Sequence, residues 1–258
     1  MDLGLQDKVA LITGGSRGIG RAIALALANE GCKVAICARD QEPLERALQQ
    51  VRETGAEAIA EVVDVRSRSE VEAVVERCAA EWGGVDILVN NVGGAAGEQS
   101  LIETTDEDWE ETFDLNVFHA VRTTRAALPY MRQRGGGAVV IVSSISGWKP
   151  GPKSQYGSAK AAEIFLAGAL ALELAECGVR VNTVAPGSIF FPGGGWARFQ
   201  EDQPEHFAQF VEREFPAGRL GTPEEVADVV AFLVSERANW INGAMIPVDG
   251  AQGRPTAF

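Results

Sequence analysis

Apolar runs alternate with amphipathic helical patterns along almost the whole chain. Seven short apolar runs are predicted as buried strands: residues 8–13, 33–38, 58–65, 85–90, 138–143, 179–184 and 244–248. Six helical patterns are predicted beside them: residues 18–30, 41–54, 67–82, 106–134, 154–177 and 223–235. Continuous apolar runs are typical of strands that are covered on both faces, and right-handed crossovers then place helices on each side. The order therefore predicts an α/β fold with a doubly wound, mainly parallel seven-stranded sheet.

One irregular stretch, at about residues 188–217, interrupts the alternation. It carries a triple glycine at 193–195 and seven of the 18 aromatic residues. Long loops of compact domains are usually functional. We interpret it as a mobile substrate loop, whose aromatics form either a hydrophobic substrate pocket or a packed lid or subunit contact. No linker, repeat or low-complexity segment divides the remainder, so we expect one domain over residues 1–258.

Composition excludes several classes of function. The formal net charge of −13 disfavours nucleic acid or an anionic membrane as the main partner. Four cysteines without a CxxC pair and only two histidines make a metal site or a disulfide framework improbable. No apolar run approaches the roughly 18 residues of a membrane span. The first residues carry no basic or long apolar segment typical of a secretory signal, so we expect a cytoplasmic protein.

A glycine-rich turn, Thr13-Gly-Gly-Ser-Arg-Gly-Ile-Gly20, joins the first predicted strand to the first predicted helix. Glycines there permit a tight turn and let the backbone approach a pyrophosphate. The free N–H groups and positive dipole end of the helix favour the same anion. Its place between strand and helix therefore indicates dinucleotide binding rather than a plain turn.

A second motif is Tyr156-x-x-x-Lys160, near the start of a predicted helix. An i, i+4 spacing puts both side chains on one helix face, where an ammonium stabilises a phenolate and suits the tyrosine to proton transfer. Ser143 and Ser144 end the preceding strand, and either hydroxyl is a candidate donor to a substrate oxygen. We prefer Ser144 because of the pattern Ser144-x-x-Gly147.

These motifs together resemble the short-chain dehydrogenase/reductase family over nearly the whole chain, which implies a Rossmann fold. The resemblance rests on residues 13–20, Asp64-Val65, Asn90-Asn91-Val92-Gly93, Asn116, Ser144, Tyr156, Lys160 and Pro186-Gly187. It implies that Tyr156 is the general acid or base and that Ser144 binds the substrate oxygen. Lys160 would hold the nicotinamide ribose, and Asn116 would bend its helix and hold a water in a proton relay.

The resemblance also implies a set of cofactor-binding residues. Asp64 and Val65 would contact adenine, Asn91 the ribose side, and Ile189 the nicotinamide. The full set is Gly14, Ser16, Arg17, Gly18, Ile19, Gly20, Arg39, Asp64, Val65, Asn91, Gly93, Tyr156, Lys160, Pro186, Gly187 and Ile189. Two departures from the family pattern stand out: Val92 replaces the usual alanine, and Phe191 replaces a threonine that binds the carboxamide.

The end of the second strand bears on the choice of cofactor. The position where NAD-dependent relatives carry an aspartate is Ala38, and Arg39 follows it. Spacing alone would also allow Asp40, a carboxylate suited to a ribose 2′-hydroxyl. Arg39 and Arg17 together suit a 2′-phosphate, so we expect NADP(H) to be preferred over NAD(H), unless Arg39 is only a solvated surface charge.

The sequence thus predicts an NADP(H)-dependent oxidoreductase that transfers a hydride between nicotinamide and a carbonyl or secondary alcohol of a hydrophobic substrate. The main alternative is a 3-oxoacyl-[acyl-carrier-protein] reductase, although Cys177 replaces an arginine that such reductases often carry and the net charge opposes an acidic carrier protein. An enoyl reductase is less favoured, because that branch usually spaces tyrosine and lysine further apart. A non-catalytic nucleotide-binding sensor is remote, since both Tyr156 and Lys160 are present. The resemblance suggests a homotetramer.

Overall fold

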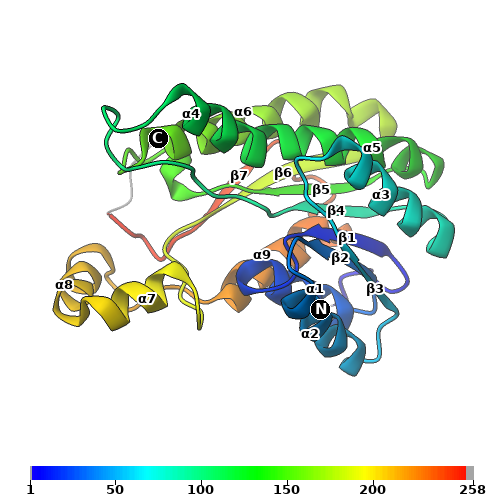
Figure 1. The fold of residues 1–258 in the computed structure, drawn as a ribbon. Helices are drawn as coiled ribbons and strands as arrows, with labels where there is room; N and C mark the ends of the chain where they lie inside the picture. The colour runs from blue at the N-terminus through cyan, green and yellow to red at the C-terminus, as the bar shows by residue number, and fades with distance from the viewer. Residues whose placement is uncertain (1, 254–258) are drawn as a thin grey trace.

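The computed structural model describes residues 2–253, and its centre is one seven-stranded sheet (Figure 1). The strands are β1 (Val9–Thr13), β2 (Lys33–Ala38), β3 (Ala58–Val62), β4 (Ile87–Asn90), β5 (Gly137–Val142), β6 (Val179–Pro186) and β7 (Met245–Val248). Their order is β3-β2-β1-β4-β5-β6-β7, and all six neighbouring pairs are parallel. The predicted α/β fold with seven strands is confirmed.

Helices cover both faces of this sheet (Figure 1). On one face lie α1 (Gly18–Asn29), α2 (Gln41–Glu53) and α9 (Pro223–Val234). On the other lie α3 (Arg68–Trp82), α5 (His119–Gln133) and α6 (Ser154–Glu173). Strand residues alternate between the two cores: Ala10 and Ile12 face α1, whereas Val9 and Leu11 face α3. Burial on both sides explains why the strands are apolar without interruption.

The strand order reverses at β1, which pairs with β2 on one side and β4 on the other. Crevices outside the carboxyl ends of the strands at such a point are the usual ligand sites of open α/β sheets. The glycine-rich turn leaves β1 at this point, and the segment after β4 begins beside it. The fold therefore brings residues 14–20 and 91–93 to one crevice.

The predicted helix at 106–134 is divided in three. It consists of α4 (Asp106–Phe113), a π-helical turn (Asp114–Phe118) and α5. Single π-turns inside helices occur frequently at functional sites, and this one contains Asn116. No helix among the described residues is long and apolar enough to cross a membrane.

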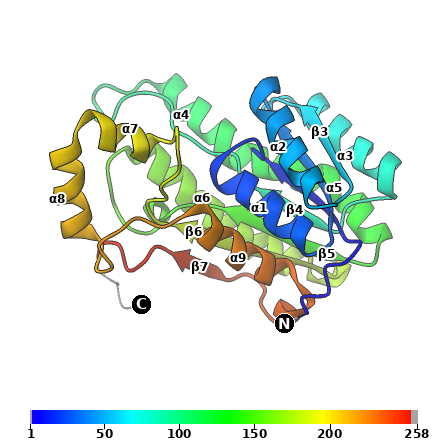
Figure 2. The same cartoon turned by 90° about the horizontal axis from the view of Figure 1, so that it is seen from below.

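The expectation of an irregular stretch at about 188–217 is wrong in part. Two helices occupy most of it, α7 (Gly195–Asp202) and α8 (Pro204–Glu214), and they project to one side of the sheet (Figure 2). Their aromatic rings pack on one another, with Trp196 stacked on Phe210 at a centroid distance of 4.8 Å. This cap cluster is a small core of its own, and it consists of Phe190, Trp196, Phe199, Phe207, Phe210, Val211, Phe215 and Leu220.

Candidate active site

The glycine-rich turn leaves room for a ligand only because it lacks side chains. Gly14 and Gly18 have positive φ angles of 68° and 54°, which other residues adopt at a cost. A Cβ on Gly20 would lie 2.3 Å from the carbonyl oxygen of Gly14, so the turn cannot carry a larger residue there. Arg17, the residue before α1, makes no side-chain cap, which leaves the first N–H groups of the helix available to an anion.

A cleft of about 330 Å³ opens in front of this turn. Ten of the predicted cofactor residues line it: Gly14, Ser16, Arg17, Gly18, Ile19, Gly20, Arg39, Val65, Asn91 and Gly93. Ala38, Asp40, Val63, Val92, Leu115 and Phe191 complete the lining. The structure thus gathers most of the predicted cofactor residues, from four separate segments, around one cavity.

Six predicted cofactor residues lie outside that lining: Tyr156 and Lys160, which are described below, and four others. The Asp64 carboxylate binds the Arg66 guanidinium at 2.8 Å, and this hydrogen bond is the main reason why the pKa of Asp64 is lowered. Pro186 ends β6, and the Gly187 N–H donates to the Val248 carbonyl at 3.0 Å. Ile189 is buried and lines a neighbouring cavity instead. Contacts of these four residues with a cofactor stay predictions.

Two arginines line the cleft: Arg39, which follows β2, and Arg17, which precedes α1. Arg39 and Arg17 are both exposed and both line the cavity, and neither is held in an ion pair among the described residues. Asp40 lines the same cleft. Positive charge outnumbers negative charge at this position, which suits a phosphate more than a hydroxyl.

Asn91 is fixed to the glycine-rich turn. Its side-chain amide donates to the carbonyl oxygen of Thr13 at 2.9 Å, and its backbone N–H donates to the Thr13 hydroxyl at 3.0 Å. The Thr13 hydroxyl also lies 2.9 Å from Nε2 of His119, and burial lowers the pKa of that histidine to about 3. The neutral ring of His119 therefore has a structural role, because it contacts the Thr13 hydroxyl that in turn binds the Asn91 backbone.

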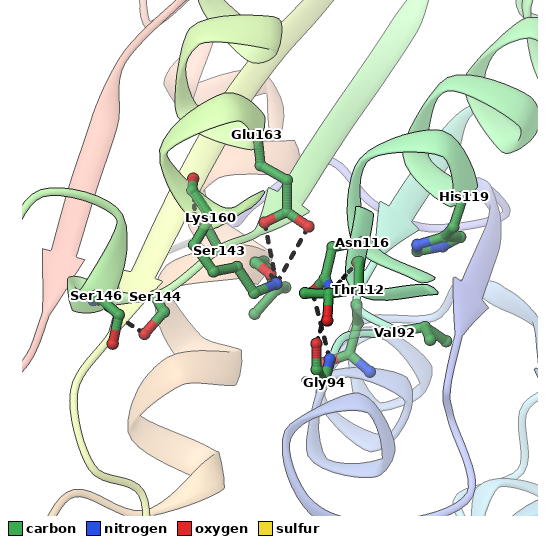
Figure 3. Close-up of polar contacts among 12 residues, drawn as sticks. Val92, Gly94, Thr112, Asn116, His119, Ser143, Ser144, Ser146, Lys160 and Glu163 are labelled. Carbon is green, nitrogen blue, oxygen red and sulfur yellow. Dashed lines mark hydrogen bonds and ion pairs between the residues drawn. The ribbon is translucent and has the colours of Figure 1, made fainter. Parts of the chain in front are cut away.

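Lys160 is the largest charged side chain in the interior, with only 2% of it exposed. Its ammonium donates to the Val142 carbonyl at 3.1 Å and to both carboxylate oxygens of Glu163, at 3.1 and 2.9 Å (Figure 3). The same ammonium lies 5.7 Å from the centre of the Tyr156 ring. The predicted pairing of Tyr156 and Lys160 on one face of α6 is therefore present.

Asn116 lies beside Lys160, with Gly93 between them. A Cβ on Gly93 would lie 2.7 Å from Lys160 Nζ and 2.8 Å from Asn116 Oδ1. The Asn116 amide donates to the carbonyls of Gly94 and Thr112, at 2.7 and 2.6 Å, and its Oδ1 accepts from the Gly94 N–H at 3.3 Å. The π-turn thus ties the segment after β4 to the buried lysine.

The two serines after β5 differ in their surroundings. Ser143 is buried, and its hydroxyl donates to the Lys160 carbonyl at 2.8 Å. Ser144 is only half-buried, and its hydroxyl accepts a hydrogen bond from the Ser146 N–H at 3.1 Å. Ser143 therefore holds α6 in place, and Ser144 keeps its hydroxyl proton for another acceptor.

Sequence reasoning missed two residues of this site. Glu163 is paired with Lys160, and the available signal was a lone acidic residue in an otherwise apolar stretch of α6. Gln155 precedes Tyr156, is buried, and donates to the carbonyls of Ala96 and Glu98 at 2.8 and 3.0 Å. It fastens the 94–98 segment to the helix of Tyr156, a contact that no local pattern indicates.

Comparisons with known proteins extend over nearly the whole chain. A family model described as Enoyl-(Acyl carrier protein) reductase matches residues 14–251. Dehydrogenase/reductase SDR family member 4 of Bos taurus is 38% identical, over 95% of this chain and 87% of that protein. The 3-oxoacyl-[acyl-carrier-protein] reductase FabG of Thermotoga maritima is 34% identical, over 95% of this chain and 98% of that protein. The crystal structure of L-sorbose reductase from Gluconobacter frateurii, complexed with NADPH and L-sorbose, matches with a TM-score of 0.93 at 36% identity and covers 99% of this chain and 100% of that one.

The fold and the cleft define the class of protein, a doubly wound α/β chain with a glycine-lined crevice at its switch point. The matches define the family. This chain belongs to the short-chain dehydrogenase/reductase family and is an oxidoreductase of that family.

Proposed function

We propose that the protein is an NADP(H)-dependent oxidoreductase that interconverts a carbonyl and a secondary alcohol. The observation that carries this proposal is the buried Lys160 ammonium, 5.7 Å from the Tyr156 ring and next to the cleft residue Gly93. A nicotinamide cofactor, when bound, supplies or accepts the hydride. Residues 1–258 would act as one dinucleotide-binding and catalytic domain.

The cleft fits a dinucleotide on three observations. Side chains on the glycines of the turn at 14–20 would clash with neighbouring atoms, so the backbone there stays open to a ligand. The first turn of α1 offers free N–H donors. The cavity is lined from Arg39 to Gly93. The helix start would hold the pyrophosphate. Asn91 and Gly93 would lie on the side of the nicotinamide ribose, and Lys160 would hydrogen-bond that ribose.

Preference for NADP(H) over NAD(H) is proposed from Arg17 and Arg39. Arg17 and Arg39 both line the cleft, and Ala38, which also lines it, offers no carboxylate. A phosphate dianion gains charge-assisted hydrogen bonds from such a pair. Asp40 is the residue that would favour NAD(H) if this assignment is wrong.

For carbonyl reduction, the Tyr156 hydroxyl would donate its proton to the substrate oxygen as the hydride reaches the carbonyl carbon. The Ser144 hydroxyl would donate a hydrogen bond to the same oxygen and so stabilise the charge that develops on it. Lys160 would stabilise the Tyr156 phenolate that remains, and Asn116 would hold a water that returns a proton. Alcohol oxidation would run the same steps in reverse.

A hydrophobic ketone is proposed as the substrate, and the observation that favours it is the position of Phe191. The other aromatics of the 188–217 segment pack within the cap cluster, which favours the packed-lid interpretation for them. Phe191 instead lines the cleft, where a Cβ on Gly18 would lie 2.9 Å from its ring. That ring presents an apolar wall where a threonine would present a hydroxyl.

A 3-oxoacyl-[acyl-carrier-protein] reductase remains the second candidate, because the Thermotoga maritima enzyme is 34% identical. The chain's own surface gives it little support. Docking of an acidic carrier protein needs basic residues, for which Arg132 and Arg134 are the candidates. Arg134 is paired with Asp86 at 2.7 Å, which leaves Arg132, whose guanidinium donates to the uncharged Cys177 sulfur at 3.0 Å.

A substrate and cofactor panel tests the proposal. Oxidation of NADPH and of NADH would be followed with an apolar ketone, a keto sugar, an acetoacetyl thioester and an enoyl thioester. We expect turnover with NADPH and the apolar ketone. Preference for the acetoacetyl thioester would favour the second candidate, and cofactor binding without any turnover would favour a nucleotide-binding sensor.

Self-association is proposed from an apolar strip on α6. Phe165 and Leu172 are 81% and 83% exposed, seven residues apart on one side of the helix. Side chains of this kind are usually covered, and a second copy of the chain would cover them symmetrically. Light scattering is expected to give the mass of a homotetramer, and Phe165→Glu is expected to lower that mass.

A cytoplasmic location is proposed from the absence of cysteine spacing suited to disulfides.

A further inference from the structure

Glu163 is a buried acidic residue that the proposed chemistry does not use. It lies three residues after Lys160 on α6, and 2% of its side chain is exposed. The neighbouring positions on the helix are apolar, from Ala161 and Ala162 to Ile164. A carboxylate in such a place is costly unless it is paired, so its partner defines what it does.

The partner is the ammonium of Lys160, and the contacts use all its donors. The Lys160 ammonium has three N–H donors, and two of its three acceptors are the carboxylate oxygens of Glu163 (Figure 3). The third acceptor is the carbonyl oxygen of Val142. Lys160 must therefore release one of these acceptors before it can bind a ribose hydroxyl. Its positive charge is also partly cancelled by the carboxylate of Glu163.

We propose that Glu163 is a positioning residue that acts through Lys160, holding the ammonium and setting the pH range in which Tyr156 can ionise. This inference rests on the proposed role of Tyr156 in proton transfer. Because a phenolate is stabilised by a neighbouring cation, a carboxylate that cancels the cation keeps the phenol protonated to higher pH.

The other groups around Glu163 do not supply the same effect. Ser143, directly after β5, contributes a hydroxyl, and Asn116 in the π-turn contributes a neutral amide. On α5, His119 is uncharged because burial lowers its pKa to about 3, and Arg122 is paired with Asp114. Among residues 2–253, Glu163 is the one carboxylate within 4.0 Å of the Lys160 ammonium.

Burial and pairing act against each other in this pair. Burial favours the neutral amine of Lys160, but the charges of Glu163 and Tyr156 outweigh it and raise the pKa of Lys160. Burial raises the pKa of Glu163, and the ammonium opposes that shift. Removing the negative charge of Glu163 makes loss of a proton from the remaining Lys160–Tyr156 pair easier.

The chain offers a direct readout, because it contains only two tyrosines, Tyr130 and Tyr156. In a Tyr130→Phe background, the ultraviolet absorbance of tyrosinate reports Tyr156 alone. We expect Glu163→Gln to move the midpoint of that titration to lower pH by roughly one to two units, the effect of a unit charge about 6–12 Å away at an effective dielectric constant of about 20. The rising limb of the pH profile for alcohol oxidation is expected to move in the same direction.

Glu173→Gln is the matched control, since Glu173 lies on the same helix and is exposed. Its titration is expected to coincide with that of the Tyr130→Phe parent. A Glu163→Gln titration that also coincides with the parent, or that moves to higher pH, would overturn the proposal.

The test also covers two other outcomes: a Glu163→Gln variant that does not fold, and a wild type that is inactive. If Glu163→Gln does not fold, Glu163→Asp decides: its shorter carboxylate lies farther from Lys160, so a smaller shift to lower pH supports the proposal and no shift overturns it. If the wild type turns over no substrate, the proposed function fails, whereas the tyrosinate titration still decides the role of Glu163.

Discussion

Substitution Asn116→Ala tests how the π-turn holds the site together. The side chain is fully buried and makes three hydrogen bonds, two to the N–H and carbonyl of Gly94 and one to the carbonyl of Thr112. Alanine leaves those backbone groups without their partner. At about 1 kcal/mol for each bond, the loss in unfolding free energy is about 3 kcal/mol.

A domain of this size loses roughly 2–4 °C in Tm for each kcal/mol, so the expected decrease is about 6–12 °C. Thermal unfolding followed by circular dichroism measures it, and Asn239→Ala is the control because Asn239 is exposed. Hydrogen exchange is expected to quicken at the amide of Gly94, which donates to Asn116. A Tm within 2 °C of wild type, with unchanged exchange at Gly94, would refute the assignment of these bonds.

Three other substitutions address the cofactor end, the cap cluster and His119. Arg39→Ala is expected to reduce the preference for NADPH over NADH in kcat/KM by roughly 1.5–3 kcal/mol, the range of a hydrogen bond to a charged group; a wild type that prefers NADH would contradict this. Trp196→Ala removes the ring stacked on Phe210, so limited proteolysis within α7 and α8 is expected to quicken roughly tenfold while the sheet stays folded; an unchanged rate would contradict it. His119 has a folded pKa of about 3 and an unfolded value of about 6.5, so the unfolded state takes up the proton between those values and stability falls as pH decreases, by at most about 1.4 kcal/mol per unit. Urea unfolding between pH 7 and 5 is expected to show a weaker pH dependence in His119→Gln, and the wild-type dependence in the exposed control His206→Gln; equal slopes in the wild type and His119→Gln would contradict this.

The sheet could be predicted because strands that are buried on both faces consist of uninterrupted apolar residues, a pattern that is visible in the sequence. The uninterrupted apolar run at 8–13 became β1, which begins one residue later and ends at the same residue, and the run at 138–143 became β5, displaced by one residue. The order of the strands was not written in any single run. The sequence analysis did not predict it, because the order depends on which strands pair in the folded sheet.

The helices α7 and α8 could not be predicted by the same means. Neither has a side-chain N-cap, because Gly194 and Gln203 precede them without capping hydrogen bonds. Their apolar faces are aromatic and close on each other rather than on the sheet, so the usual link between a helical pattern and the main core is missing.

Within the site, short-range spacing was more informative than long-range pairing. The i, i+4 relation of Tyr156 and Lys160 could be read from the chain, and so could the set of cleft glycines. The Asp64–Arg66 ion pair joins residues two positions apart and was not predicted, and the expected contact of Asp64 with adenine stays a prediction. The burial of Glu163 depends on how α6 packs against the sheet, which no local pattern reports.

The central claim is that Tyr156 transfers the proton while the cleft holds the cofactor. Tyr156→Phe removes one oxygen and keeps the ring, and Tyr130→Phe makes the same change in the other tyrosine of the chain. The measurement is kcat for ketone reduction together with NADPH binding by fluorescence. We predict that Tyr156→Phe lowers kcat by at least about 10²-fold, the scale of lost general acid catalysis, while it still binds NADPH; Tyr130→Phe should keep wild-type turnover. Near-wild-type turnover by Tyr156→Phe, from a preparation whose wild type is active, would contradict the account.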